Sequence, residues 1–292
     1  MSFPEYNPAA VCVYYLCVTV PMMFCSNPLF SLLALAVGII VLFMYDDKAK
    51  ASSVLLYIAV PIAGALINPL FNHNGVTVLF VLNDSPVTLE AALYGLSSGL
   101  TISAVLVWFR SFTAIMTTDR LLYVFSLLSP KLALILSMTV RYIPLYRRQA
   151  EKTRNAQKAC GISGEVSLPD KLCGGMRVFS AMVTWALENG VVTADSMTAR
   201  GYGCVPVRTS FRIFKWFRGD TVLLLLSLAA AAVETWALVA KAVSYVWYPR
   251  IIRPETGTAQ ILFGICAVLC MLIPVIIEGK ERLRWKYLQS KI

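Results

Sequence analysis

Residues 28–45 read PLFSLLALAVGIIVLFMY and contain no charged side chain. A transmembrane helix needs about 20 mainly apolar residues, and this run comes close to that length. Five further segments have a similar character: 9–25, 51–69, 89–109, 221–240 and 259–277. The first of these is short, and it is the weakest of the predicted spans. The sequence therefore predicts an all-α integral membrane protein with about six transmembrane helices in a lipid bilayer.

The composition supports a membrane environment. Of the 292 residues, 58% are hydrophobic and 14% are charged, whereas soluble domains carry about 25% charged residues. The formal net charge is +10. A basic balance of this kind is typical either of nucleic-acid binding or of cytoplasmic loops beside a membrane.

The positions of Lys and Arg favour the membrane interpretation. If the N-terminus is cytoplasmic and six spans alternate, the inner segments 46–50, 110–220 and 279–292 hold 23 of the 26 basic residues. The outer loop 70–88 holds none. Cytoplasmic loops are enriched in Lys and Arg. We therefore expect a multi-pass cell-membrane protein with both termini in the cytoplasm and no nucleic-acid partner.

This arrangement predicts four regions along the chain. They are N-terminal spans in 1–109, a cytoplasmic insert in 110–220, C-terminal spans in 221–278 and a basic cytoplasmic tail in 279–292. In the outer loop 70–88, Asn74-Gly75 is a turn signal and the β-branched run after it is typical of a small hairpin. His73, the only histidine, has no neighbour at metal-ligand spacing, so we expect no metal site.

The insert 110–220 is too long for a simple loop between spans. Its pattern predicts two long helices, about 130–160 and 172–200. The first starts at Ser129-Pro130, changes from apolar to highly charged, and is expected to bend at Pro144 and end at Gly161. The second carries an apolar stripe with a period close to 3.6 residues and ends at Gly201.

Both helices end in similar short motifs. The first ends in Lys158-Ala159-Cys160-Gly161, and the second runs from Asp195 to Ala199-Arg200-Gly201. A small Ala allows close approach, Arg offers a rigid fork of donors, and Gly turns the chain so that the residue before it lies at an exposed tip. Such a tip suits a groove on another protein. Alternatively, Arg200 only caps the carbonyl groups of its own helix, which the triplet by itself favours.

The run RYIPLYRRQAEKTRNAQKACG (141–161) resembles the first coupling segment of the transmembrane T components of energy-coupling factor (ECF) transporters, the EcfT/CbiQ family. In that family an Arg-aromatic-x-Pro pattern, here Arg141 to Pro144, precedes a charged stretch that ends in Ala-Arg-Gly. The run TADSMTARGYG (193–203) is similar to the second coupling segment. One position departs from the pattern, because the first Arg of the family is Cys160 here. Lys158 substitutes only in part, since an ammonium group is a point charge.

The resemblance implies the energy-coupling subunit of an ATP-driven micronutrient importer. Its partners would be two ABC-type ATPases, which bind the ATP, and a small membrane subunit that binds the substrate. The ends of the two coupling helices, 158–161 and 199–201, would contact the ATPases. Arg141, Pro144 and Asp195 would support these helices. This chain itself would bind no cofactor and catalyse nothing, and the substrate could equally be a vitamin or a cobalt or nickel ion.

Two alternatives remain, a stand-alone secondary carrier and an intramembrane enzyme. The sequence contains no P-loop and no nucleophile or zinc-protease motif. Carriers often contain broken helices, and Pro61 with Gly64 and Gly95 with Gly99 are weak hints of these. Glu234 lies within a predicted span, where an ionisable side chain is usually functional or paired. Alternatively, its carboxylate reaches water or Lys241.

Overall fold

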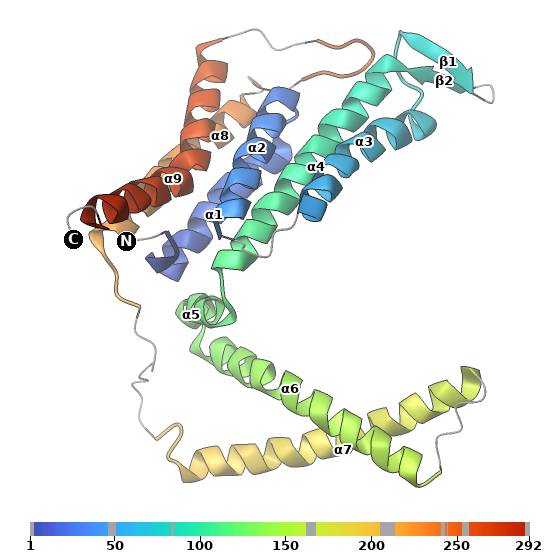
Figure 1. Cartoon of the computed structure of the whole chain (residues 1–292), viewed down its shortest axis with the longest axis vertical. Helices are drawn as coiled ribbons and strands as arrows, with labels where there is room; N and C mark the ends of the chain where they lie inside the picture. The colour runs from blue at the N-terminus through green and yellow to red at the C-terminus, as the bar shows by residue number, and fades with distance from the viewer. Residues whose placement is uncertain are drawn as a thin grey trace. The chain divides into compact units, whose positions relative to one another are not determined.

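The apolar run 28–45 forms one helix, α2 (Pro28–Tyr45), in the computed structural model of the protein (Figure 1). The structure describes residues 3–45, 51–82, 85–161, 168–204, 214–240, 243, 245–252 and 257–289. The chain divides into two units, Met1–Val124 together with Phe214–Ile292, and Phe125–Ile213. Helices make up most of the described elements, so the predicted all-α membrane class is confirmed.

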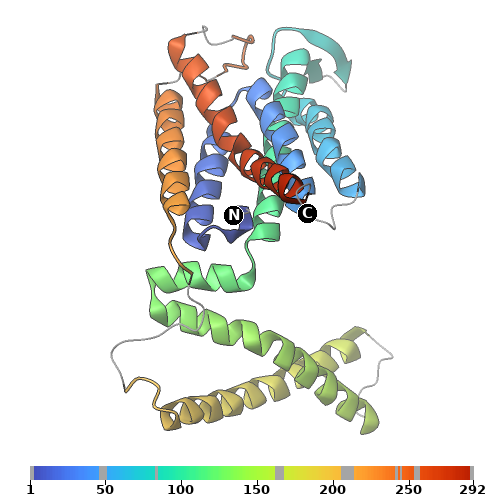
Figure 2. The ribbon, with the colours of Figure 1, turned by 60° about the vertical axis from the view of Figure 1, so that its left-hand side comes forward.

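The first unit contains all six predicted spans, which lie side by side in Figure 2. Besides α2 they are α1 (Pro8–Phe24), α3 (Ala51–Phe71), α4 (Leu89–Ile115), α8 (Arg218–Val239) and α9 (Thr258–Gln289). Within the described residues, five are long and apolar enough to cross a membrane, and α1 with 17 residues is one residue shorter than α2. Both α4 and α9 continue as helix beyond the predicted span ends at 109 and 277.

Helix α1 is a core helix of this unit and contacts α4, α8 and α9. Tyr14 is fully buried, and its hydroxyl donates to the backbone carbonyl of Cys270 at 2.9 Å. The hydroxyl of Tyr15 shares a hydrogen bond of 2.6 Å with Ser111. These bonds satisfy polar groups that burial would otherwise leave unpaired. The short first span is therefore held inside the bundle by contacts on several sides.

Helices α3 and α4 pack at short range through glycine. A Cβ atom on Gly95 would lie 2.3 Å from the carbonyl oxygen of Gly64, and one on Gly99 would lie 2.6 Å from the Cα of Pro61. Small residues allow transmembrane helices to approach closely where bulkier ones would hold them apart. These four residues, which by sequence alone hint at a carrier, therefore have a packing role in this unit.

The outer loop forms the predicted hairpin from β1 (Val78–Leu82) and β2 (Ser85–Thr88), which pair antiparallel. Asn74 and Gly75, the turn signal of this loop, precede β1. The carboxylate of Glu90, buried in the first turn of α4, accepts hydrogen bonds from the backbone N–H of Thr77 at 3.2 and 3.3 Å. A Cβ on Gly75, which has φ 150°, would lie 2.7 Å from this carboxylate. Glu90 thus holds the loop against α4.

The N-terminal segment is tied to the start of α8 by one buried carboxylate. Asp220 is fully buried and accepts hydrogen bonds from the backbone N–H of Asn7 at 2.8 Å and of Phe217 at 2.7 Å. The side chain of Asn7 in turn accepts from the backbone N–H of Ala9 at 3.0 Å and caps α1. The starts of two sequence-distant helices are therefore joined through a single acidic side chain.

The second unit is built from two long helices, α6 (Pro130–Ala159) and α7 (Leu168–Ala199). Both helices of the insert are confirmed, and α7 begins four residues earlier than predicted. Helix α6 remains one helix through Pro144. A further helix, α5 (Thr118–Leu128), was not predicted, and its residues up to Val124 belong to the first unit.

Candidate coupling site at the ends of α6 and α7

Helices α6 and α7 cross at a polar and aromatic contact. The hydroxyl of Tyr142 donates to Thr193 Oγ1 at 2.8 Å. Tyr146 stacks on Tyr142 with ring centroids 5.5 Å apart, and its other neighbour, Trp185, meets it edge-on at 5.5 Å. Sequence reasoning did not identify this crossing, although aromatic residues four apart on a helix lie on one face. The contact is modest in size, and no side chain of α6, or of α7 from Pro169 to Ala199, is fully buried.

The order of these contacts places the two helix ends far apart. Position 142 on α6 meets position 193 on α7, whereas position 146 meets position 185. The helices therefore run in roughly opposite directions where they cross, as Figure 2 also shows. At 1.5 Å per residue, Cys160 lies about 20 Å beyond the crossing and Arg200 about 10 Å beyond it. The predicted site residues thus form two separate tips.

The tip of α7 is a complete backbone cap of the Schellman type. The N–H of Gly201 donates to the carbonyl of Thr198 at 2.9 Å, and the N–H of Tyr202 donates to the carbonyl of Met197 at 3.0 Å. Gly201 has φ +78°, the left-handed conformation that this cap requires and that L-residues rarely adopt. Two carbonyl groups at the helix end are therefore satisfied without the Arg200 side chain.

Arg200 is exposed at this tip, in the position just before the left-handed glycine. In the described part of the chain its guanidinium makes no hydrogen bond or ion pair with another residue. This argues against the interpretation in which Arg200 only caps its own helix, because backbone N–H groups bind the terminal carbonyl groups here. Ala199 beside it is also exposed, so the surface around the guanidinium is open.

The tip of α6 repeats this geometry. The N–H of Gly161 donates to the carbonyl of Lys158 at 3.0 Å, and Gly161 has φ +69°. Cys160 is exposed and occupies the same place before its glycine as Arg200 does on α7. The equivalence predicted from the two motifs is therefore present in the backbone, although the side chains differ. Ala159 and Lys158 are exposed as well.

The remaining predicted site residues lie on the helices leading to the tips. Arg141 and Pro144 are exposed on α6 beside the crossing residue Tyr142, and Asp195 is exposed in the last turns of α7. The second half of α6 is strongly basic and contains one acidic residue, Glu151, whose carboxylate lies 3.6 Å from Arg147 Nε. Lys158 lies in the last turn, where a positive charge complements the helix dipole.

The apolar stripe of α7 is only partly covered by α6. Met182, Ala186 and Met197 are half-buried. The other side of the stripe is exposed, with Met176 at 68% and Leu187 at 69% of their surface accessible. The exposed members of this α7 stripe are Leu172, Met176, Phe179, Val183, Leu187 and Val191. One side of the α7 stripe is therefore exposed on the second unit.

Glu234 lies in the core of the first unit, on α8, and 3% of its surface is exposed. This burial argues against the interpretation in which its carboxylate reaches water. Cys17, Cys25 and Cys270 lie near it. Lys241, the other partner considered, lies outside the described residues. Among the described residues, no group of three or more His, Cys, Asp or Glu could hold a metal ion.

These features define a polytopic helical membrane protein that carries a separate unit of two crossed helices with exposed, glycine-terminated ends. Comparison with known proteins gives the family. Residues 4–211 match the cobalt transport protein family CbiQ. The chain belongs to this family, and the resemblance recognised in its two coupling segments is confirmed.

Individual relatives agree with this assignment. The chain is 26% identical over 218 residues to the energy-coupling factor transporter transmembrane protein EcfT of Streptococcus equi, covering 69% of this chain and 79% of that protein. It is 33% identical over 92 residues to EcfT 1 of Listeria monocytogenes and 36% identical over 98 residues to EcfT of Listeria innocua. These two matches span only 35% and 36% of the Listeria proteins and 31% and 32% of this chain.

Proposed function

We propose that this protein is the energy-coupling transmembrane subunit of an ATP-driven ECF importer for a vitamin or a transition-metal ion. The observation that carries the proposal is the matched pair of helix tips. Each long helix ends at a glycine with positive φ, at +69° and +78°, and each exposes the residue before that glycine. A rigid helix with an exposed terminal turn transmits a displacement at one end to the contacts along its length.

The two tips would each insert into a groove on one ABC-type ATPase. Their separation supports two independent docking sites, because they lie on opposite arms beyond the crossing of α6 and α7. Arg200 would pair with a carboxylate in its groove, where a guanidinium forms a charge-assisted and often bidentate contact. At the α6 tip, Cys160 cannot form that contact, so Arg200 would contribute more of the docking free energy. ATP would bind to the ATPases and not to this chain.

The exposed half of the α7 stripe would contact the small substrate-binding membrane subunit. Its methionine and aliphatic side chains present a large apolar surface, and methionine adapts to partners of different shape. When the ATPases close and reopen, the displacement of the tips would pass through the crossing at Tyr142 and Tyr146 to this surface. The chain would thereby couple ATP hydrolysis in its partners to movement of the substrate-binding subunit, without being an enzyme itself.

The N-terminus and C-terminus would both face the cytoplasm. This orientation is supported by the distribution of Lys and Arg, of which 23 of 26 fall in the segments assigned to that side. It would also put residues 110–220 on the side where ATP and the ATPases are found. Localisation would be the cell membrane.

Co-purification and ATP-dependent uptake test the docking role directly. Truncating an Arg that pairs with a buried carboxylate in an interface costs about 2–5 kcal/mol. Arg200→Ala should therefore weaken ATPase binding by at least about 30-fold, so both ATPase recovery with the tagged chain and uptake should fall. Arg154→Ala is the matched control, because Arg154 is also exposed but lies before the last turn of α6. The control should keep both properties.

A second variant, designed to strengthen ATPase binding, provides an independent test. Cys160→Arg restores the family pattern at the α6 tip, and it should strengthen ATPase binding without changing the stability of the membrane unit. Normal ATPase recovery by Arg200→Ala would contradict the docking role. Uptake by the purified chain alone, with no ATPase present, would instead support a secondary carrier, and chemical turnover of a substrate would support an intramembrane enzyme.

A further inference from the structure

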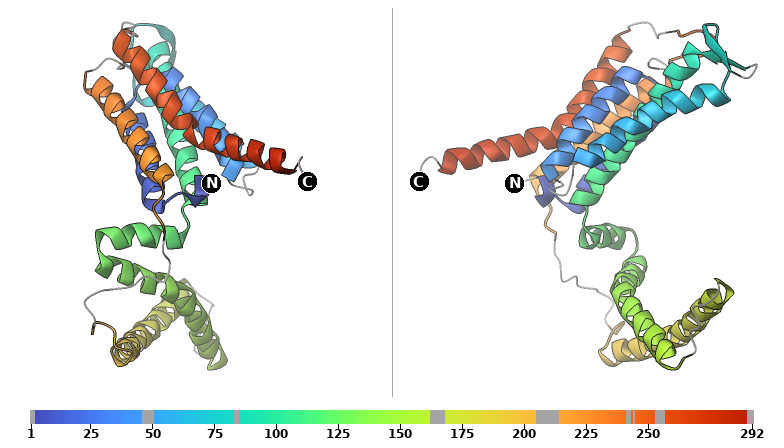
Figure 3. Two further views of the ribbon diagram at one scale, coloured as in Figure 1. Left: turned by 90° about the vertical axis from the view of Figure 1, so that its left-hand side faces the viewer. Right: turned by 45° about the vertical axis from the view of Figure 1, so that its right-hand side comes forward.

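Helix α9 is longer than a membrane requires. Its 32 residues correspond to about 48 Å at 1.5 Å per residue, whereas the hydrocarbon core of a bilayer is about 30 Å thick. The apolar part ends at Ile277, and from Gly279 the helix reads GKERLRWKYLQ. We call residues 279–289 the terminal segment. Figure 3 shows this end of α9 reaching sideways from the other helices of the first unit.

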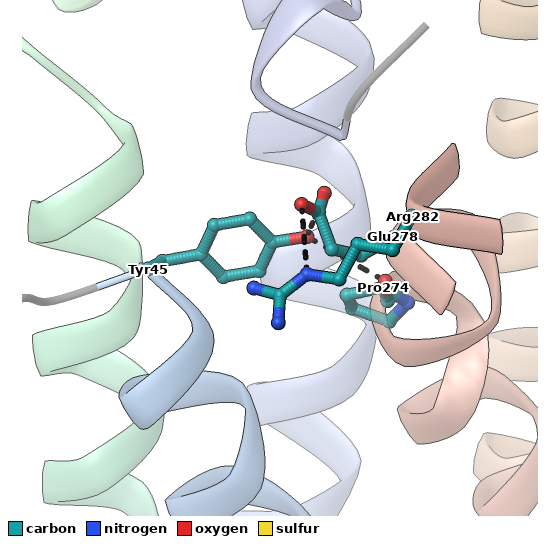
Figure 4. A network of polar contacts seen from close by, with 4 residues as sticks. All are labelled: Tyr45, Pro274, Glu278 and Arg282. Atoms are coloured by element: carbon teal, nitrogen blue, oxygen red, sulfur yellow. Dashed lines mark hydrogen bonds and ion pairs between the residues drawn. The ribbon is translucent and has the colours of Figure 1, made fainter. Parts of the chain in front are cut away.

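One side of α9 at this end is fixed to the protein by polar contacts (Figure 4). The Tyr45 hydroxyl, at the end of α2, lies 3.5 Å from both the carbonyl oxygen of Pro274 and Oε2 of Glu278. Arg282 Nε lies 3.7 Å from Oε1 of Glu278, whose side chain is only 17% exposed. Glu281 is half-buried as well. The acidic side of α9 therefore faces the bundle, which sets the rotation of the terminal segment.

The opposite side of the terminal segment is basic and partly apolar. At about 100° per residue, Lys280, Leu283, Arg284, Lys286 and Tyr287 fall within an arc of about 160°, centred roughly opposite the two glutamates. All five are exposed, with Leu283 at 70% and Tyr287 at 60%. This basic face contains no acidic residue. Leu283 and Tyr287 lie near its middle, between the cationic side chains.

We propose that the basic face lies on the membrane surface and binds the headgroups of anionic phospholipids. The face begins at Lys280, about 5 Å along the helix from the last apolar residue of the span, so the bilayer surface is its nearest neighbour. Leucine and tyrosine insert at the level of the headgroups, and lysine and arginine extend beside them to the phosphates. A soluble protein would have to displace that surface in order to bind the same side chains.

The charges predict the strength of this attachment. Each Lys or Arg near an anionic surface strengthens binding about fivefold. Lys280, Arg284 and Lys286 together should strengthen attachment on the order of a hundredfold over a neutral surface. Since helix ends fray and exchange their amide hydrogens quickly, attachment should slow exchange in the terminal segment.

Hydrogen–deuterium exchange of the full-length chain in lipid nanodiscs tests the proposal. One preparation contains phosphatidylcholine alone, and the other contains one part phosphatidylglycerol to two parts phosphatidylcholine. Exchange in the terminal segment should be several-fold slower with phosphatidylglycerol, and added salt should reduce the difference because it screens exposed charges. Peptides from α3 and α4 should exchange equally in both preparations.

Two variants isolate the role of the basic side chains. The triple variant Lys280→Gln, Arg284→Gln, Lys286→Gln should lose the response to phosphatidylglycerol. The charge-preserving variant Lys280→Arg, Arg284→Lys, Lys286→Arg should keep it. Equal exchange of the wild-type segment in both membranes would overturn the proposal, as would an unchanged response in the neutral variant. Protection that appears only when ATPases are added, whatever the lipid, would assign the face to a protein partner instead.

Discussion

The contact between α3 and α4 leads to a stringent prediction for Gly95→Ala. The added methyl group would lie 2.3 Å from the carbonyl oxygen of Gly64 and 2.7 Å from the Cβ of Asn68. Real Cβ atoms essentially never approach another heavy atom within 3.0 Å, so the two helices must separate. Because one of the contacted atoms belongs to the backbone, no rotation of a side chain relieves the clash.

The cost of this substitution can be estimated from its parts. Overpacking of a well-packed interior costs about 1–3 kcal/mol. Separation of the helices would also weaken the hydrogen bond of 2.6 Å from Asn68 Nδ2 to the carbonyl of Ala91, which is worth about 0.6 kcal/mol between membrane helices. The sum of about 2–4 kcal/mol should lower the apparent Tm by roughly 4–10 °C.

Thermal unfolding in detergent, followed by circular dichroism, is the appropriate assay. Gly264→Ala is the matched control, since Gly264 also lies in a membrane helix but a Cβ there would meet nothing within 4 Å. Alanine has a higher helix propensity than glycine, so the control should unfold at the same temperature as the wild type or slightly above it. Equal unfolding temperatures for the two variants would refute the close packing of α3 on α4.

Three further predictions concern the caps and the helix crossing. Gly201→Ala should destabilise the α7 tip by about 1–2 kcal/mol, because a backbone φ of +78° is strained for any residue with a Cβ. Amide exchange at the tip should become faster. Unchanged exchange would be inconsistent with the cap. Tyr142→Phe removes the hydrogen bond to Thr193 and should destabilise the crossing by about 1 kcal/mol. Amide hydrogen exchange on α7 beside the crossing should become faster, while the Tm of the first unit stays constant. Unchanged amide exchange there would show that this bond is dispensable. Asp220→Ala leaves two backbone N–H groups, one buried and one part-buried, without their acceptor and should lower stability by about 3 kcal/mol. Asp170→Ala, at an exposed position in the first turn of α7, should have little effect. Similar Tm losses in both variants would show that the Asp220 bonds do not stabilise the chain.

The tertiary structure gives roles to two acidic residues, Glu90 and Asp220, that the sequence analysis did not single out. Glu90 lies in the first turn of α4 and Asp220 in the first turn of α8. Each accepts hydrogen bonds from the backbone of a segment outside its own helix. Because hydrogen bonds of this kind join positions up to 213 residues apart, no local sequence pattern predicts them.

The sequence by itself determined the membrane class, the approximate spans, the two long helices of the second unit and the family. These features depend on local composition and on periodicity, since about 20 apolar residues must cross a bilayer as a helix whatever their neighbours are. The short motifs at 158–161 and 199–201 were also readable, because a helix that ends in glycine has few alternatives.

Only the tertiary structure decided how these parts meet. The crossing at Tyr142 and Trp185, the opposed directions of the two tips and the glycine contact of α3 with α4 depend on which faces come together. An apolar stripe indicates that a helix has a partner without naming it, as the half-covered stripe of α7 demonstrates. Likewise, Lys280, Arg284 and Lys286 belong to an ordinary charged tail in sequence, and the contact of Tyr45 with Glu278 decides that the face they share on α9 points away from the bundle.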